Sequence, residues 1–509
     1  MLSLSAPSLP PTDSCTTSNG APSHSATGSA RVDLFFATSR GIETDRLLNL
    51  LFASWTEDPL DTLKLVAYCR DIRGGKGERQ ITRDMMKWLA SHASRELEHN
   101  LVHYIAEYGR FDDVLALMGT PLENAGLLFW AQQLKNDLAT LSLDSPTASI
   151  SLAAKWIPSE NKSADKKLSI SRKLCKKLNL KNQAQLRKVY LSPLRARLNI
   201  LERKMCAKEW DSIEFGKVPS VAMKIHGRKG KAFERNDADR FEEYKSSLAK
   251  GTAKVNAKDL FPHQIVEQYL RDSSEVDELL EAQWRVMLEN GAKLGDLSST
   301  LVMSDVSGSM SGVPMNISIA LGILVSQLTS AEWKGLVLTF ETSPMFHEVK
   351  GATLRDQVQS LAGAKWGGST NFCAAFNLIL NTALKAKICA DAMPKRLIVV
   401  SDMQFDCAND TSNQTSYASV RAKYAAAGYE VPHLVFWNVN GSTSDFPATS
   451  AMPNVSLISG YSPEILKAVL KGSQITPFDT MMNAINDPRY DLITLPPPLS
   501  EAPLSDEHQ

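Results

Sequence analysis

The stretch that decides the fold is Leu301-Val302-Met303-Ser304-Asp305-Val306-Ser307-Gly308-Ser309-Met310. A short apolar run, typical of a buried strand, ends in a carboxylate, and two hydroxyls follow at alternate positions in a glycine-containing turn. This pattern gathers three hard oxygen donors, Asp305, Ser307 and Ser309, and such donors suit Mg²⁺ or Mn²⁺ rather than Zn²⁺. The simpler interpretation is a Ser/Gly turn after a buried strand, because a short motif is only a hypothesis until its context agrees.

Two later stretches supply that context. Trp366-Gly367-Gly368-Ser369-Thr370-Asn371 is a glycine-rich loop that opens a helical pattern and carries a hydroxyl. Arg396-Leu397-Ile398-Val399-Val400-Ser401-Asp402 is another apolar run that ends in aspartate. Together these residues resemble a von Willebrand factor A (vWA) domain and its metal-ion-dependent adhesion site. The resemblance implies a metal site formed by Asp305, Ser307, Ser309, Thr370 and Asp402.

The physical setting agrees with the resemblance. Ligands of open α/β sheets gather at the carboxyl ends of the strands, near the point where the strand order reverses. Two carboxylates, three hydroxyls and water can complete an octahedral shell that retains exchangeable positions. In members of the vWA family a partner's carboxylate can fill one of those positions. The resemblance therefore implies Mg²⁺ (or Mn²⁺) as cofactor and a protein partner at the metal face.

Length and composition describe an ordinary globular protein. The chain has 509 residues, a formal net charge of zero and 43% hydrophobic residues, enough for two or three domains with real cores. Its seven cysteines form no Cys-x-x-Cys pair, which argues against a zinc site or a disulfide framework and fits a reducing compartment. No apolar run reaches membrane-spanning length, and the N-terminus lacks a secretory signal pattern. We expect an intracellular, cytoplasmic location; the oligomeric state does not follow from the sequence.

Four segments follow from the pattern along the chain. Residues 1–29 are rich in Ser, Pro, Thr, Ala and Gly, which predicts a disordered arm. Residues 30–294 read as helical, residues 295–475 as the vWA domain, and residues 476–509 as a Pro-rich, partly disordered extension. The strands expected in the vWA domain are 300–304, 336–340, 397–401, 433–437 and 455–458, and the helices are 315–329, 354–361, 372–385, 418–427 and 463–470. The expected fold is multidomain α plus α/β, a HEAT-like α-helical array followed by a doubly wound, Rossmann-like sheet.

Other motifs resemble the domain-of-unknown-function family twenty-eight-twenty-eight, whose members join a helical N-terminal region to a C-terminal vWA module. The matching stretches include Arg70 to Arg79, Lys155 to Glu160, Val218 to Met223, Phe261-Pro262-His263 and Ser401 to Asp406. More distantly, the layout resembles the TROVE/Ro autoantigen family, in which a ring of HEAT-like repeats binds RNA and a vWA domain closes the ring. No strict repeat period is visible in residues 30–290, so the ring is implied by layout alone.

A basic stretch adds evidence that does not depend on any family. Between Lys155 and Lys208 there are sixteen Lys or Arg residues and three acids. Such a cluster in a neutral protein is an electrostatic footprint for phosphate backbones. Tyr190, Trp210 and Phe233 offer candidate stacking faces for unpaired bases. The predicted nucleic-acid-binding residues are Lys166, Lys167, Arg172, Lys173, Lys176, Lys177, Arg187, Lys188, Arg195, Arg197, Arg228 and Lys229.

The alternatives remain open at this point. The basic stretch can equally be a solvated helix face, or a surface that docks on acids such as those between Asp272 and Glu281. The glycine-rich loop Gly74–Gly77 can cradle a phosphate or form a helix-helix turn that needs positive φ. His99 and His103 lie one helical turn apart, but without a third ligand a solvated helix face is the better interpretation.

The hypothesis from sequence is a non-catalytic, RNA-binding ribonucleoprotein component. Ser307 and Ser309 have no histidine nearby in sequence, and two carboxylates are fewer than two-metal hydrolysis usually requires. The helical region would grip RNA, and the vWA face would recruit a protein through a divalent cation. The alternative hypothesis is a protein-only adaptor or scaffold that uses the vWA metal site and the helical array for protein-protein interaction.

Overall fold

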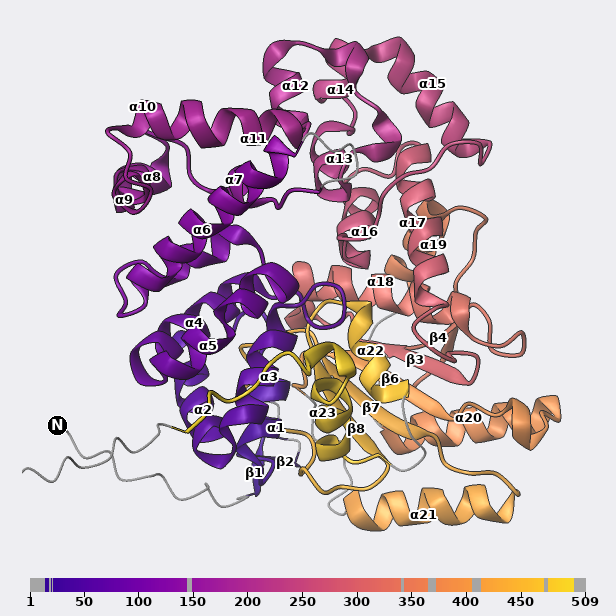
Figure 1. Ribbon diagram of the computed structural model, residues 1–509. Coiled ribbons are helices and arrows are strands. Elements are labelled where there is room, and N and C mark those ends of the chain that lie inside the picture. The colour runs from indigo at the N-terminus through magenta and orange to yellow at the C-terminus, as the bar shows by residue number, and fades with distance from the viewer. Residues whose placement is uncertain are drawn as a thin grey trace, which may run out of the picture. The chain divides into compact units, whose positions relative to one another are not determined.

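The computed structural model describes residues 14–17, 20, 22–143, 149–339, 343–364, 372–404, 413–470 and 475–498. The side chains of residues 372–373 and 413–419 are not described. The chain divides into two compact units, each of which is discontinuous in sequence. The first unit comprises residues 1–81 and 199–487, and the second comprises residues 82–198 and 488–509. Figure 1 labels the elements of both units.

A six-stranded mixed sheet forms the centre of the first unit, in the order β5-β4-β3-β6-β7-β8. All neighbouring strands are parallel except β4 and β5, which are antiparallel. This confirms the expected α plus α/β class. The strands are β3 (Thr300–Ser304), β4 (Leu336–Thr339), β5 (Phe346–Glu348), β6 (Arg396–Ser401), β7 (His433–Asn438) and β8 (Val455–Ser459). Every expected strand is present; β5, a short edge strand with little apolar character, is additional.

The two faces of the sheet are covered by different helices. Side chains alternate along a strand, so Leu301, Leu397 and Leu434 share one face, where they join a core with Phe376 and Tyr424. Those two aromatic residues belong to α20 (Phe372–Ala386) and α21 (Asn413–Ala426). Helix α18 (Val313–Leu328) packs on β3, β4 and β6, and α23 (Pro477–Ile485) packs on β8. Both layers are visible in Figure 1.

Helix α18 is apolar around most of its circumference because it is enclosed. Its residues 317–326 are all buried. The side away from the sheet meets α16 (Pro262–Arg271), α17 (Glu278–Gly291) and α19 (Leu354–Ala362). A helix that is hydrophobic on all sides requires cover on all sides. Residues that precede the sheet in sequence therefore complete its hydrophobic core.

Part of the expected disordered arm is ordered. Strands β1 (Ser14–Thr16) and β2 (Pro22–His24) pair antiparallel, and His24 exchanges two backbone hydrogen bonds with Phe446, each 2.9 Å long. The expectation of disorder does not hold for these residues, because they are ordered by backbone pairing with a distant loop rather than by their own apolar surface. Ser29 then caps α1 (Ala30–Ala37).

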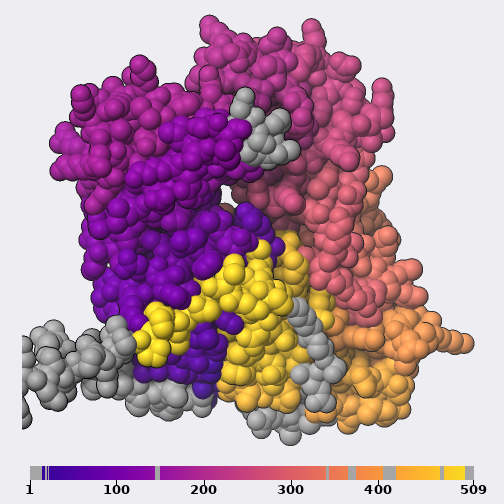
Figure 2. Space-filling model, viewed as in Figure 1, coloured from indigo at the N-terminus to yellow at the C-terminus, as the bar shows by residue number. Residues whose placement is uncertain are grey.

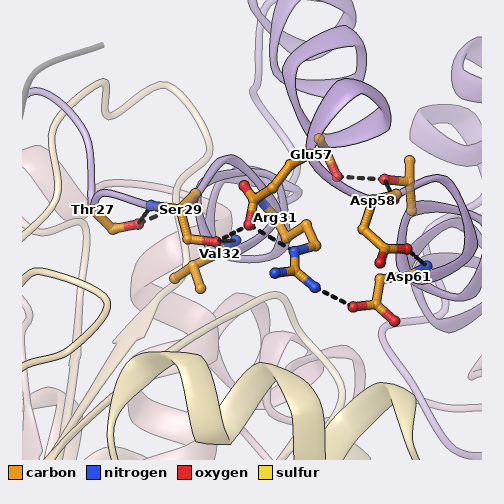
Figure 3. Close-up of polar contacts among 9 residues, drawn as sticks. Thr27, Ser29, Arg31, Val32, Glu57, Asp58 and Asp61 are labelled. Carbon is orange, nitrogen blue, oxygen red and sulfur yellow. Dashed lines mark hydrogen bonds and ion pairs between the residues drawn. The ribbon is translucent and has the colours of Figure 1, made fainter. Parts of the chain in front are cut away.

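Ion pairs anchor this N-terminal region to the next two helices (Figure 3). The Arg31 guanidinium donates to Glu57 at the end of α2 (Thr44–Glu57), with Nε 2.7 Å from Oε1, and also to Asp61 in α3 (Pro59–Arg70). Ser29 donates to the same Glu57 carboxylate at 2.9 Å. These contacts fix the start of α1 relative to α2 and α3.

The glycine-rich loop after α3 is a tightly packed turn. A Cβ at Gly75 would lie 2.0 Å from the backbone oxygen of Tyr68, and Gly77 has φ +69°. Lys76 between them is fully buried and donates to Thr38 O at 3.0 Å, Thr38 Oγ1 at 2.7 Å and Ser459 Oγ at 2.7 Å, as well as to Phe35 O. This geometry favours the helix-helix turn over the phosphate cradle, because the lysine is committed to the protein's own oxygens.

Another group of helices in the first unit surrounds an aromatic cluster. Phe215, Phe233 and Phe241 pack edge to face or tilted, with ring centroids 5.1 to 5.6 Å apart. Phe233 is fully buried, so it offers no stacking face to a base, contrary to the expectation. The helices around the cluster are α12 (Leu201–Ala207), α13 (Ser220–His226), α14 (Ala232–Asn236) and α15 (Ala238–Ala249).

The second unit is helical, and many of its helices are short. Its longest helix, α6, has Trp130 fully buried and donating to Phe111 O at 2.8 Å. Its helices are α4 (Arg79–His92, begun in the first unit), α5 (Ser94–His103), α6 (Glu123–Ser142), α7 (Ala153–Trp156), α8 (Ser163–Leu168), α9 (Ile170–Lys177), α10 (Gln183–Leu186) and α11 (Ser192–Arg197), with a π-helical turn η3 (Arg187–Leu191) between the last two. No described helix of either unit is both long and apolar enough to cross a bilayer.

The compact units follow packing rather than sequence order. Residues 30–81, expected within one helical region, pack with the sheet, whereas residues 82–198 form the other unit. The expected C-terminal extension begins with the ordered helix α23, which belongs to the sheet unit. The domain boundaries expected at 29, 294 and 475 concern consecutive segments of the chain, and they remain predictions.

Replacing the buried lysine tests the turn. Lys76→Met keeps the aliphatic stem but leaves buried oxygens of Phe35, Thr38 and Ser459 without their donor, so we expect the free energy of unfolding to fall by about 2–4 kcal/mol. Denaturant titration measures this change. The control is Arg73→Met in the same loop, where the side chain is exposed and little change is expected. A Lys76→Met protein as stable as the control would contradict the structural role.

Candidate functional site

Two aspartates follow adjacent strands at the centre of the sheet. Asp305 follows β3 and Asp402 follows β6, and these strands pair in parallel with Ser304 opposite Val400. The chain runs from β3 through β4 to β5 on one side and then crosses to β6 on the other. The pair β3 and β6 is therefore the switch point of the sheet, where open α/β folds place their ligands.

The Asp305 carboxylate is buried and held at both oxygens. It is 2% exposed. Its Oδ1 accepts from the Ser307 backbone N–H at 2.8 Å, and its Oδ2 accepts from Ser401 Oγ at 2.7 Å. Burial raises the pKa of Asp305; the hydrogen bonds from Ser307 and Ser401 oppose the rise, and the negative charge of Asp402 adds to it. A cation beside the two carboxylates would relieve this cost.

The two hydroxyls of the first loop lie side by side. Ser307 Oγ and Ser309 Oγ are 3.1 Å apart, and Ser309 is exposed. The structure thus brings together Asp305, Ser307 and Ser309, as the sequence predicts, next to the strand end that carries Asp402. Thr370 falls within residues 365–371, outside the described residues, so its place in the site remains a prediction.

The Asp402 loop is supported by a segment from much earlier in the chain. Asp402 is 3% exposed; its Oδ1 accepts from Gln404 N at 3.2 Å, and its backbone oxygen accepts from Thr443 Oγ1. Further along the Thr443 loop, Asp445 Oδ2 accepts from Ser23 Oγ at 2.6 Å. The N-terminal segment thus steadies the loop that packs against Asp402.

The chemistry of this donor set fits a hard divalent cation. The described donors are carboxylate and hydroxyl oxygens, the ligands that Mg²⁺ and Mn²⁺ prefer. Among the described residues there is no group of three or more His, Cys, Asp or Glu side chains that could hold a metal ion. A site here would therefore need hydroxyls as ligands and would leave room for exchangeable water or a partner's carboxylate.

Sequence reasoning overlooked two positioning residues, Ser401 and Thr443. Ser401 Oγ donates to Asp305 and accepts from Met403 N at 3.1 Å, which links the two aspartate loops. Its signal was a hydroxyl at the end of an otherwise apolar run, directly before the aspartate. Thr443 carries no comparable local signal, because only the folded chain brings it to Asp402.

Seven of the predicted nucleic-acid-binding residues of the second unit are exposed: Lys166, Lys167, Arg172, Lys176, Arg187, Lys188 and Arg197. They lie on or next to α8, α9, η3 and α11, which follow one another closely in sequence. Except for Arg197, these seven make no ion pair with any residue that the structure describes. The segment that carries them, purple to magenta in Figure 2, forms a continuous part of the surface.

Three other residues of this set contact their own unit. Lys173 Nζ pairs with Glu123 Oε1 at 2.7 Å, and Lys177 donates to Asn124. Arg195 is half-buried and donates to Ala154 O, Ser159 Oγ and Ile157 O, at 2.7, 2.8 and 2.9 Å. Burial lowers the pKa of Arg195. Its guanidinium is committed to the fold, so it is a poor candidate for gripping phosphate.

The last two predicted residues, Arg228 and Lys229, lie in the first unit. Arg228 is half-buried, and Lys229 Nζ lies 3.1 Å from Glu275 Oε2. Nearby, Lys224 faces Glu267 at 4.0 Å. Here the basic residues meet acids of their own unit, as the alternative interpretation expected for the acidic segment between Asp272 and Glu281. The strongest candidate for phosphate binding is therefore the exposed group in the second unit.

Comparison with known proteins gives a family for nearly the whole chain. The model described as Domain of unknown function (DUF2828) matches residues 17–118 and 127–297, and the model described as Domain of unknown function (DUF7788) matches residues 299–489. Uncharacterized protein L728 of Acanthamoeba polyphaga mimivirus is 32% identical over 502 residues, which cover 92% of this chain and 86% of the viral protein. No solved structure matches significantly. The chain therefore belongs to the DUF2828 family, with a DUF7788 region over its sheet.

Proposed function

We propose that this protein is a non-catalytic, RNA-binding ribonucleoprotein component that recruits a protein partner through a divalent cation. The observation that carries the RNA part is the exposed basic group on α8, α9 and η3, namely Lys166, Lys167, Arg172, Lys176, Arg187 and Lys188. Exposed lysines and arginines without acidic partners attract phosphate backbones, and such attraction does not depend on base sequence. RNA ranks above DNA only by analogy of layout with the Ro family, and a closed ring of HEAT-like repeats remains part of that analogy.

The metal part of the proposal is that the sheet region is a vWA domain with an adhesion site for Mg²⁺ or Mn²⁺. The strand order, the single antiparallel edge strand and the positions of Asp305 and Asp402 at the switch point support it. Asp305, Ser307, Ser309, Thr370 and Asp402 would hold the ion. When bound, the ion would supply an electrophilic position for a partner's carboxylate, and the protein's own residues would orient it.

A binding role also agrees with the described histidines of the sheet region. Both ring nitrogens of His433 are hydrogen-bonded: Nδ1 lies 3.2 Å from Asn454 Oδ1, and Nε2 lies 2.8 Å from Ser456 Oγ. Burial lowers the pKa of His433 to about 4. A neutral imidazole with both nitrogens hydrogen-bonded stabilises the fold and is poorly suited to proton transfer. His347 similarly contacts Ser360 Oγ at 3.2 Å.

The second candidate function is a protein-only adaptor. The pairing of Lys229 with Glu275 favours it, because it shows basic residues of this chain satisfied by its own acids. In that case the metal face would be the main working surface. The two functions differ in whether the exposed basic group on α8, α9 and η3 binds nucleic acid.

Replacing four exposed basic residues tests RNA binding. A variant in which Lys166, Lys167, Arg172 and Lys176 are all replaced by Ala should bind a labelled single-stranded RNA more weakly. The loss should be similar for RNAs of different sequence. The slope of log K against log salt should flatten by about 0.7 for each phosphate that the variant no longer neutralises. Fluorescence anisotropy across a salt series measures both quantities. EDTA should leave the affinity unchanged.

The control replaces four exposed lysines of the sheet region, Lys334, Lys350, Lys385 and Lys387, by Ala. It removes the same number of positive charges and should retain most of the affinity. Equal losses in both variants would mean that only net charge matters. If the wild-type protein bound no RNA at low salt, the RNA-binding function would be contradicted and the adaptor function supported.

Removing the first aspartate tests the metal site. Wild-type protein should gain about 2.7 kcal/mol of stability when Mg²⁺ is present at about 100 times its dissociation constant, and Asp305→Ala should lose this gain. Thermal melting with Mg²⁺ and with EDTA measures the effect. Asp391→Ala, at an exposed position in the same region, is the matched control. A Mg²⁺-dependent melting shift that survives in Asp305→Ala would exclude this site.

A positioning role for Ser401 gives a separate prediction. Ser401→Ala removes the donor to Asp305 Oδ2, and we expect Mn²⁺ affinity to fall about 10-fold, as for other residues that orient metal ligands. Ser401→Thr keeps the hydroxyl and should restore the affinity. Mn²⁺ titration followed by electron paramagnetic resonance measures binding directly. Equal affinity in the Ala and Thr variants would show that the hydroxyl does not position Asp305.

A further inference from the structure

The C-terminal segment of the second unit is firmly anchored. Tyr490 and Ile493 are each 1% exposed. Tyr108 Oη donates to Arg489 O at 2.7 Å, and the Arg489 guanidinium pairs with Glu107 at 3.2 Å. The yellow segment in Figure 1 that leads to residue 498 therefore has a defined path along its unit.

Helix α5 holds the backbone of this segment in an extended form. The Asn100 side chain bonds both backbone groups of Thr494: its Nδ2 donates to Thr494 O at 2.8 Å, and its Oδ1 accepts from Thr494 N at 3.0 Å. His99 Nε2 lies 2.9 Å from Thr494 Oγ1, and Arg95 donates to Pro497 O. One helix thus takes up the polar groups of the segment and leaves its other side free.

The proline run at the end of the anchored segment favours polyproline II geometry. Residues 495–498 are Leu-Pro-Pro-Pro. The proline ring fixes φ near −65°, and each residue before a proline is confined to extended conformations. Polyproline II has three residues per turn. Leu495 and Pro498, which are three residues apart and both exposed, would therefore share one face, and Ile493 and Pro496, which are less exposed, another.

Apolar side chains line the outer face of the segment. Leu492 is 47% exposed and Leu495 is 46% exposed, although the backbone between them is ordered. A folded protein that holds leucines outward on a rigid backbone presents a surface that another protein can bury. From Tyr490 to Gln509 the sequence contains four acids, Asp491, Glu501, Asp506 and Glu507, and no Lys or Arg.

We propose that residues 492–498 are a docking segment for a protein domain with an aromatic-lined groove for polyproline II ligands. Such grooves recognise the preformed helix through its prolines and flanking apolar side chains. Anchoring on α5 lowers the entropy lost on binding, because the segment is already extended and oriented. The acidic flank selects a groove whose rim is basic. This inference does not depend on the metal site or on RNA binding.

The test uses the full chain and three labelled probe domains: an SH3, a WW and an EVH1 domain. Fluorescence anisotropy measures binding of each probe to the wild-type chain and to Leu495→Ser/Pro498→Ala. Both side chains are exposed, so the variant should melt at the wild-type temperature. Pro121→Ala, an exposed proline of the same unit, is the control. We expect at least one probe to bind wild type and control equally, and to bind the double variant at least tenfold more weakly.

Two outcomes would overturn the proposal. One is that none of the three probes binds the wild-type chain at about 100 µM, a concentration that detects even weak complexes. The other is that a probe binds the wild-type chain and the double variant with equal affinity, which would locate its contact elsewhere on the chain.

Discussion

Parallel pairing of β3 with β6 is the constraint on which the candidate metal site depends. It places Asp305 and Asp402 at neighbouring strand ends, where burial and the nearby Asp402 make the ionised form of Asp305 costly and raise its pKa. The protein offsets part of that cost with hydrogen bonds from Ser307 and Ser401 to Asp305. A buried carboxylate whose ionised form is disfavoured is a physical reason to look for a cation beside it.

The sheet could be predicted because its signals are local. Each parallel strand is a short apolar run, and Asp305 and Asp402 directly follow two of these runs. The pattern that predicts the strands therefore also predicts the two aspartates of the candidate site. Strand β5 was not predicted because its three residues, two half-buried and one exposed, form no apolar run. The strands β1 and β2 could not be predicted from a local pattern, because Ser23 and His24 bond to Asp445 and Phe446, more than four hundred residues away.

Charge counting predicted the basic stretch but not the availability of each side chain. Arg195 and Lys188 are equivalent in a count, yet one guanidinium bonds three groups of its own chain and the other side chain is exposed. Lys76 is a second example. Its place in a glycine-rich loop suggests a phosphate ligand, but its ammonium group is buried and donates to Thr38 and Ser459. Composition reports how much charge a segment carries; only packing decides where that charge is satisfied.

The Lys76 contact has a consequence for how the chain is made. Its partner Ser459 lies 383 residues further along, and contacts of such long range slow folding because the intervening chain must be closed into a loop. At a synthesis rate of about 5–20 residues per second, roughly 20–80 s pass between the synthesis of Lys76 and that of strand β8. During that interval Phe35 and Lys76 lack the Ser459 hydroxyl that both of them contact in the folded protein. A nascent chain of this protein should therefore depend on chaperones for longer than its N-terminal helices alone would suggest.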